Sequence, residues 1–223
     1  MMTTKHCEAL GCHDTATGFS TLCNRHKQTM RRHGHPLQTG ITAHELRPYL
    51  ARIKARQERN KGSELWSILE ARWKALEGHG KSIMEAVMGG AAHIRHERLA
   101  AQQIGILAGS VPADKAIQTA LAMYLMADER PTRFQSDKAF RFELVRRMRG
   151  LSEVNAASYW DHKAGKMRKV YRDTPPDAME TLGRWIAEAF GAAGLTLAGK
   201  EREEAQLKAT ERQRLADALE RLE

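Results

Sequence analysis

The sequence predicts an all-α protein, in which a multi-helix body carries a small metal-binding module at its N-terminus. Two observations predict the body: apolar residues recur at helical spacing from residue 42 onward, and alternating β-branched runs are nearly absent. A third predicts the module, because the three cysteines of this 223-residue chain all fall between positions 7 and 23. We expect three parts: the module (residues 1–40), the helical body (41–198) and a charged C-terminal helix (199–223).

The cysteines have the spacing of a zinc site. Cys7 and Cys12 form one pair, Cys23 follows after ten residues, and His26 lies three residues further on. Structural zinc takes four sulfur or nitrogen ligands in a tetrahedron, and two close pairs supply them. A helix that begins near Asn24 places Cys23 and His26 on one face, which favours His26 as the fourth ligand. The alternatives are the other nearby histidines: His6, His13, His33 and His35.

This module is too poor in large apolar side chains to fold by burial alone, so we expect metal ligation to supply its folding energy. Four protein ligands close the coordination sphere, which predicts a structural zinc in a treble-clef-like or ribbon-like module. The helix after the second ligand pair carries a broad stripe of cations suited to phosphate contact. These cations are Arg25, Lys27, Arg31 and Arg32.

The run GFSTLCNRHKQTMRRHGHP (residues 18–36), preceded by Cys7-x4-Cys12, resembles the N-terminal zinc module of bacteriophage HNH-type homing endonucleases and related mobile-element proteins. In that family the basic helix ends in Arg-Arg-x-Gly-Asp-Pro, and here His35 stands in place of the Asp. Lys27 and Met30 replace the usual aromatic residues. No asparagine lies between suitably spaced histidines, so no HNH core follows. The resemblance implies a DNA-contacting module without the nuclease activity.

The positive charge of the chain lies in two segments. Residues 1–60 hold ten Lys or Arg against four Asp or Glu, and residues 131–172 hold eleven against four, whereas residues 61–130 are neutral. Two separate basic segments predict an anionic partner, nucleic acid first, with an ordinary solvated surface as the alternative.

The second basic segment predicts a helix-turn-helix at residues 136–164. Ser136 caps a first helix that Gly150 ends, and a second helix is expected from Glu153 to about His162. The alternatives are a basic patch that does not enter a DNA groove and an ordinary solvated surface. The basic segment after Trp160 could follow a nucleic-acid backbone or form a short wing. The candidate contacts are Arg146, Arg147, Arg149, Lys163, Lys166, Arg168, Lys169 and Arg172.

Helical stripes of apolar residues mark the core of the body. They are Trp66, Leu69, Trp73 and Leu76; Met84, Val87, Met88 and Ala91; Ile117, Ala120, Leu121, Tyr124 and Leu125; and Met179, Leu182, Ile186 and Phe190. Breaks are expected at residues 61–63, 78–80, 109–112, 130–131, 150 and 174–177. The C-terminal helix lacks a sustained heptad repeat, so we expect at most a short homodimer contact there.

These features predict a duplex-DNA-binding regulator or accessory factor of a phage or mobile element, acting in the bacterial cytoplasm. No apolar run approaches the roughly 18 residues that span a bilayer, so no membrane association is expected. The chain is not expected to be an enzyme: Gly80-Lys81-Ser82 lacks the first glycine of a P-loop, and His93 and His96 lack metalloprotease spacing. The alternatives are an anti-defence or adaptor protein that binds a host complex, and a cryptic nuclease.

Overall fold

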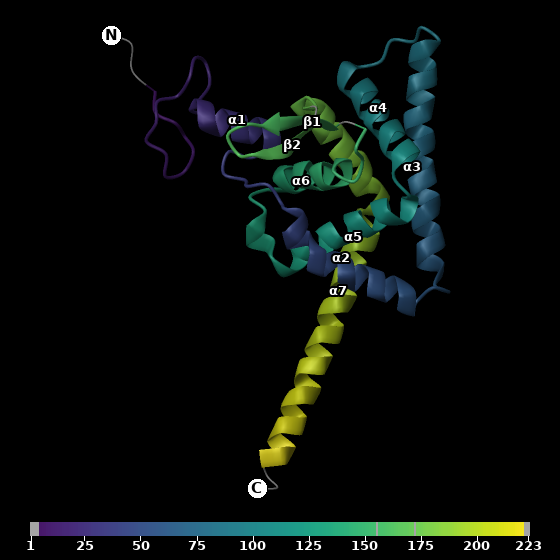
Figure 1. Cartoon of the computed structure of the whole chain (residues 1–223). Coiled ribbons are helices and arrows are strands. Elements are labelled where there is room, and N and C mark those ends of the chain that lie inside the picture. The colour runs from purple at the N-terminus through teal and green to yellow at the C-terminus, as the bar shows by residue number, and fades with distance from the viewer. Residues whose placement is uncertain (1–4, 155, 172, 221–223) are drawn as a thin grey trace.

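The computed structural model describes residues 5–154, 156–171 and 173–220, and within them helices dominate (Figure 1). The prediction of an all-α protein is confirmed, with one small hairpin as the exception. The α-helices are α1 (Asn24–His33), α2 (Ala43–Arg59), α3 (Glu64–Met88), α4 (Arg95–Ser110), α5 (Ala113–Glu129), α6 (Asp137–Arg149) and α7 (Pro176–Glu220). A 3-10 turn (Pro131–Arg133) follows α5, and the strands β1 (Ala156–Asp161) and β2 (Lys166–Tyr171) pair antiparallel.

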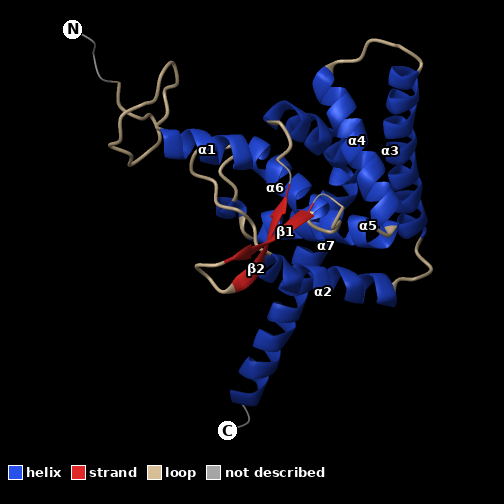
Figure 2. Cartoon of the chain, turned by 45° about the horizontal axis from the view of Figure 1, so that its top comes forward, coloured by secondary structure: helices blue, strands red, loops and turns tan. Residues whose placement is uncertain are grey.

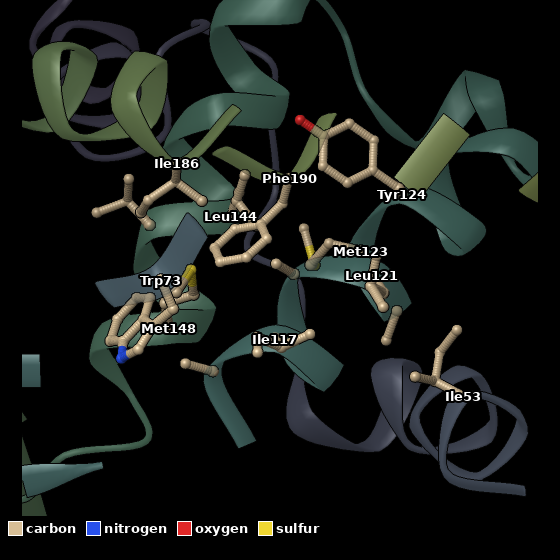
Figure 3. Close-up of a cluster of buried hydrophobic side chains, with 14 of the residues drawn as sticks. Ile53, Trp73, Ile117, Leu121, Met123, Tyr124, Leu144, Met148, Ile186 and Phe190 are labelled. Carbon is tan, nitrogen blue, oxygen red and sulfur yellow. The ribbon is translucent and has the colours of Figure 1, made fainter. Parts of the chain in front are cut away.

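Helix α5 is the centre of the body. Every residue from Ala116 to Met126 is buried, because α2, α3, α6 and α7 pack around it. The core includes a stacked pair, Trp73 of α3 and Phe190 of α7, whose ring centroids lie 6.3 Å apart (Figure 3). Dense interdigitation of this kind supplies most of the stability of a helical domain.

Three of the four predicted apolar stripes are buried as expected: those that begin at Trp66, Ile117 and Met179. The prediction for the fourth stripe, which begins at Met84, is wrong at its end: Met88 is 76% exposed, and Ala91 lies beyond the end of α3. The break predicted at Gly78–Gly80 is also wrong, because α3 runs through it. A β-carbon at Gly80 would lie 3.2 Å from Ile104, so this glycine allows α3 and α4 to pack closely.

The predicted helix-turn-helix at residues 136–164 is absent. Its first helix is present as α6, with Ser136 accepting a hydrogen bond from the Ala139 N–H at the N-terminus. The expected second helix is instead the strand β1, which turns back into β2 (Figure 2). Asp161 accepts hydrogen bonds from the N–H groups of Lys163 and Ala164, and Gly165 takes the left-handed φ of 59° that closes the turn.

Helix α7 continues through the expected boundary at residue 198 and projects from the body (Figure 1). Arg52 and Arg56 of α2 pair with Glu201, and Arg202 pairs with Asp128 of α5, which fixes the direction in which α7 leaves the body. Residues 205–220 are exposed along their whole length. Over the described part of the chain, no helix combines the length and apolar character needed to cross a membrane.

Candidate metal centre and basic surface

Two tight loops and the start of a helix build the metal cluster. In the first loop, Gly11 adopts a left-handed φ of 72° and the Cys12 N–H donates to the Ala9 carbonyl, which turns the chain back toward Cys7. Cys23 is the N-cap of α1, so His26 falls in its first turn. One candidate ligand pair therefore comes from a loop, and the other comes from the start of a helix.

The four residues predicted from spacing come together. The Nδ1 atom of His26 lies 3.4 Å from the sulfur of Cys7 and 3.3 Å from that of Cys23, and the sulfurs of Cys12 and Cys23 are 3.9 Å apart. All four ligand atoms lie within 4.8 Å of one another, close enough to share one metal ion. Cys7, Cys23 and His26 are buried, and Cys12 is half-buried. The arrangement is compatible with a metal site in which every ligand comes from the chain.

The two thiols of the first loop differ in acidity. Burial raises the pKa of Cys7, but hydrogen bonds from the backbone N–H groups of Cys23 and Ala9 and from His26 outweigh it and lower the pKa to about 6. The Asp14 N–H lowers the pKa of Cys12, but burial and the neighbouring sulfurs raise it by more, and its net pKa is raised. Crowded thiolates repel one another, so a bound cation would stabilise their ionised forms.

Helix α1 separates ligands from cations. Buried His26 and half-buried His33 lie on the face toward the metal cluster and the body, two turns apart. The four predicted cations of α1 occupy the remaining surface, and all are exposed: Arg25, Lys27, Arg31 and Arg32. Among them Arg25 is engaged with the carboxylate of Asp14, at 3.9 Å, on the solvent side of the cluster. The outer face of α1 therefore presents a positive surface to solvent.

The hairpin forms a second exposed basic element. Lys163, Lys166 and Arg168 are exposed, and Arg168 pairs with Asp161 at 2.6 Å. Of the other two predicted contacts here, Lys169 lies on β2, whereas Arg172 lies outside the described residues. The strands contact each other far more than they contact any helix. In Figures 1 and 2, α1 and the hairpin turn project from the same side of the body.

The hairpin also exposes aromatic and apolar side chains, and it arranges them in cross-strand pairs that were not predicted. Trp160 is 50% exposed and lies opposite Met167, which is 57% exposed, and Tyr159 lies opposite Arg168. The signal for a hairpin was the Asp161 to Gly165 turn, with Tyr159 and Trp160 before it and Val170 and Tyr171 after it, because aromatic and β-branched residues favour strands.

The predicted contacts of α6 are not on an open surface. Arg149 is only 9% exposed and donates to the side-chain oxygen of Gln103, and Arg146 and Arg147 are half-buried. Helix α6 packs against α5 and α7. Because the expected second helix is the strand β1, these three arginines do not belong to a helix-turn-helix, and their contact with nucleic acid stays a prediction.

A buried carboxylate fixes α1 to the body. Glu143 of α6 is fully buried and lies 2.5 Å from His33 Nδ1, and it also accepts from the Ile41 N–H at 2.7 Å. Arg133 donates to the carbonyls of Thr39 and Gly40 in the intervening linker. The linker is thus held at both ends, and the metal cluster has a defined position relative to α6. This joint was not predicted, because its partners lie 110 residues apart and no local spacing relates them.

Comparison with known proteins gave no relatives: no family model, no curated protein and no solved structure matches the chain.

Proposed function

We propose that the chain is a zinc-stabilised, duplex-DNA-binding protein of a phage or mobile element, a regulator or accessory factor. The observation that carries the proposal is the division of α1: one face supplies a metal ligand, and the exposed remainder carries four cations. The metal would fix the N-terminal end of α1, and the Glu143 joint holds its C-terminal end. A rigid cationic helix is suited to phosphate contact at low entropic cost.

Zinc fits the donor set and its dimensions. Zn–S bonds of about 2.3 Å and Zn–N bonds of about 2.0 Å give a tetrahedron with S···S edges of about 3.8 Å and S···N edges of about 3.5 Å. The Cys12–Cys23 separation is 3.9 Å, and the His26 separations are 3.4 and 3.3 Å. Three sulfurs and one imidazole match structural zinc better than they match Mg²⁺ or Ca²⁺, which take oxygen ligands.

The hairpin supplies a second contact in this proposal. Its turn projects from the same side as α1, so a single duplex could touch both. Lys163 and Lys166 would meet phosphates, and the half-exposed Trp160 would cover sugar or base edges.

The test is binding of a labelled random-sequence duplex to the full-length, zinc-loaded protein by fluorescence anisotropy. Wild type is expected to bind with micromolar or tighter affinity, and Arg31→Ala/Arg32→Ala about tenfold more weakly. The matched control is Lys115→Ala/Arg184→Ala, which removes the same charge from exposed positions on α5 and α7. Equal weakening in both double variants would mean that net charge, not α1, is responsible.

A second candidate is a protein-interaction factor, an adaptor or anti-defence protein that binds a host complex. The projecting end of α7 favours it, because Leu207, Leu215 and Leu219 are each more than half exposed there. Duplex binding that is absent, or insensitive to salt, would favour this candidate over the first.

A further inference from the structure

The tip of the β1–β2 hairpin presents a pair of large apolar side chains to solvent. Trp160 and Met167 lie directly opposite each other, next to the Asp161–Lys166 pair that closes the ladder, and they are 50% and 57% exposed. Directly opposed residues of an antiparallel ladder project to the same side, so the two side chains form one apolar protrusion. The strands contact each other far more than they contact any helix, so this protrusion stands clear of the core.

A polar brace on the other face of the hairpin holds the tip. Successive strand residues alternate between faces, so Asp161 and Arg168 lie on the face opposite to Trp160, where they pair at 2.6 Å. The same carboxylate accepts hydrogen bonds from the N–H groups of Lys163 and Ala164 in the turn. One side chain thus ties the turn to the second strand, which gives the apolar protrusion a firm support.

Positive charge surrounds the protrusion. Residues 160–167 hold two lysines, Lys163 and Lys166, against one aspartate, and both lysines are exposed. Apolar side chains between cations are complementary to a polymer with an anionic exterior and an apolar interior. A DNA duplex is built in this way, because phosphates border its grooves and stacked bases fill its centre.

We infer that the hairpin inserts Trp160 and Met167 between two stacked base pairs, from the minor groove, and kinks the duplex. Apolar wedges of this kind bend DNA by about 20–90°. Lys163 and Lys166 hold the phosphates beside the opened step. The inference rests on the proposed duplex binding and adds its mode: a bent duplex can follow both α1 and the hairpin turn, which project from the same side of the body (Figures 1 and 2).

The test measures affinity and bending separately, with the full-length, zinc-loaded protein. Fluorescence anisotropy of a singly labelled duplex of about 20 base pairs with a central TA step gives the Kd. Energy transfer between dyes at the two ends of the same duplex, at saturating protein, reports the bend. Wild type should raise the transfer efficiency. It should also bind the TA duplex several-fold more tightly than an A-tract duplex, because A-tracts are stiff and TA steps kink easily.

Trp160→Thr/Met167→Thr removes the wedge and keeps side chains that favour strands. Because phosphate contacts supply most of the affinity, this variant should bind the A-tract duplex within about threefold of wild type. It should not raise the energy transfer, and it should lose the preference for the TA step. Tyr159→Thr is the matched control, since it removes a 49% exposed aromatic side chain from the opposite face of the hairpin, and it should bend the duplex as wild type does.

The possible failures are distinguishable. Absence of any complex would refute the duplex-binding function and the wedge together. A complex without increased energy transfer, or one that Trp160→Thr/Met167→Thr bends as wild type does, would overturn the wedge alone. Loss of bending in Tyr159→Thr as well would also overturn it, because the fold of the hairpin would then be responsible. Tighter binding of the single strand than of the duplex would instead assign Trp160 to base stacking on an unpaired strand.

Discussion

The metal module (residues 5–33) and the helical body are held together by different forces. The buried apolar residues of the module amount to Cys7, Ala9 and Cys23, and two of these are candidate ligands. The body instead has a continuous core that joins α2 to α7. One chain therefore contains a region whose stability should follow metal binding and a region whose stability should follow packing.

The largest expected effect is loss of the metal. Cys23→Ser removes a candidate ligand, and structural zinc contributes about 10 kcal/mol or more to modules of this size. We expect zinc content to fall to near zero and amides of residues 5–33 to exchange rapidly, while the thermal midpoint of the body stays nearly unchanged. Zinc analysis and hydrogen exchange provide the readouts.

His13→Ala is the matched control for that prediction, because this exposed histidine lies next to Cys12 but outside the cluster. It should keep its zinc. Collapse of the whole protein in Cys23→Ser would contradict the independence of the two regions.

The converse change acts on the body. Phe190→Ala removes a fully buried ring that stacks on Trp73, and cavities of this kind cost about 3–5 kcal/mol. Urea denaturation followed by helical circular dichroism should show the loss. Zinc affinity, measured with a competing chelator, should remain as in wild type. A fall in zinc affinity alongside the loss of stability would show that one core serves both regions.

The joint between the regions should show an intermediate effect. Glu143→Gln keeps the shape of the side chain but removes the charge that faces His33 and Arg146, and a weakened buried hydrogen bond costs about 1–3 kcal/mol. We expect faster amide exchange in residues 34–41 with zinc content unchanged. Unaltered exchange there would show that Glu143 does not hold the linker.

The smallest expected effect comes from acid. Arg133, then the N–H and hydroxyl of Thr42, lower the pKa of Glu45 from 4.5 to about 2, although burial acts against them. A lowered pKa means that this carboxylate stabilises the fold above pH of about 4.5, and that the contribution is lost as pH falls toward about 2. Glu45→Gln should therefore cost about 1–2 kcal/mol at pH 7 and nearly nothing at pH 2, by urea denaturation. An equal cost at both values would exclude the ion pair as its cause.

The metal ligands and most core stripes could be predicted from sequence, because both depend on local spacing. The hairpin could not be predicted with the same rule: the apolar spacing after Gly150 suits a helix as well as a strand, and the turn at Asp161 to Gly165 decides between them. The arginines show a second limit. Arg31 and Arg149 each lie in one of the two basic segments, yet Arg31 is exposed and Arg149 is buried, because burial depends on packing between distant helices.

The most direct test of the proposed function is the salt dependence of duplex binding, compared across four proteins: wild type, Arg31→Ala/Arg32→Ala, Lys163→Ala/Lys166→Ala and the combination. Each lost phosphate contact should reduce the slope of log K against log salt by about 0.9. Each double variant should therefore lose about 1.8 and the combination about 3.6, if α1 and the hairpin contact one duplex. A slope that is flat in wild type, or unchanged in all three variants, would contradict the account.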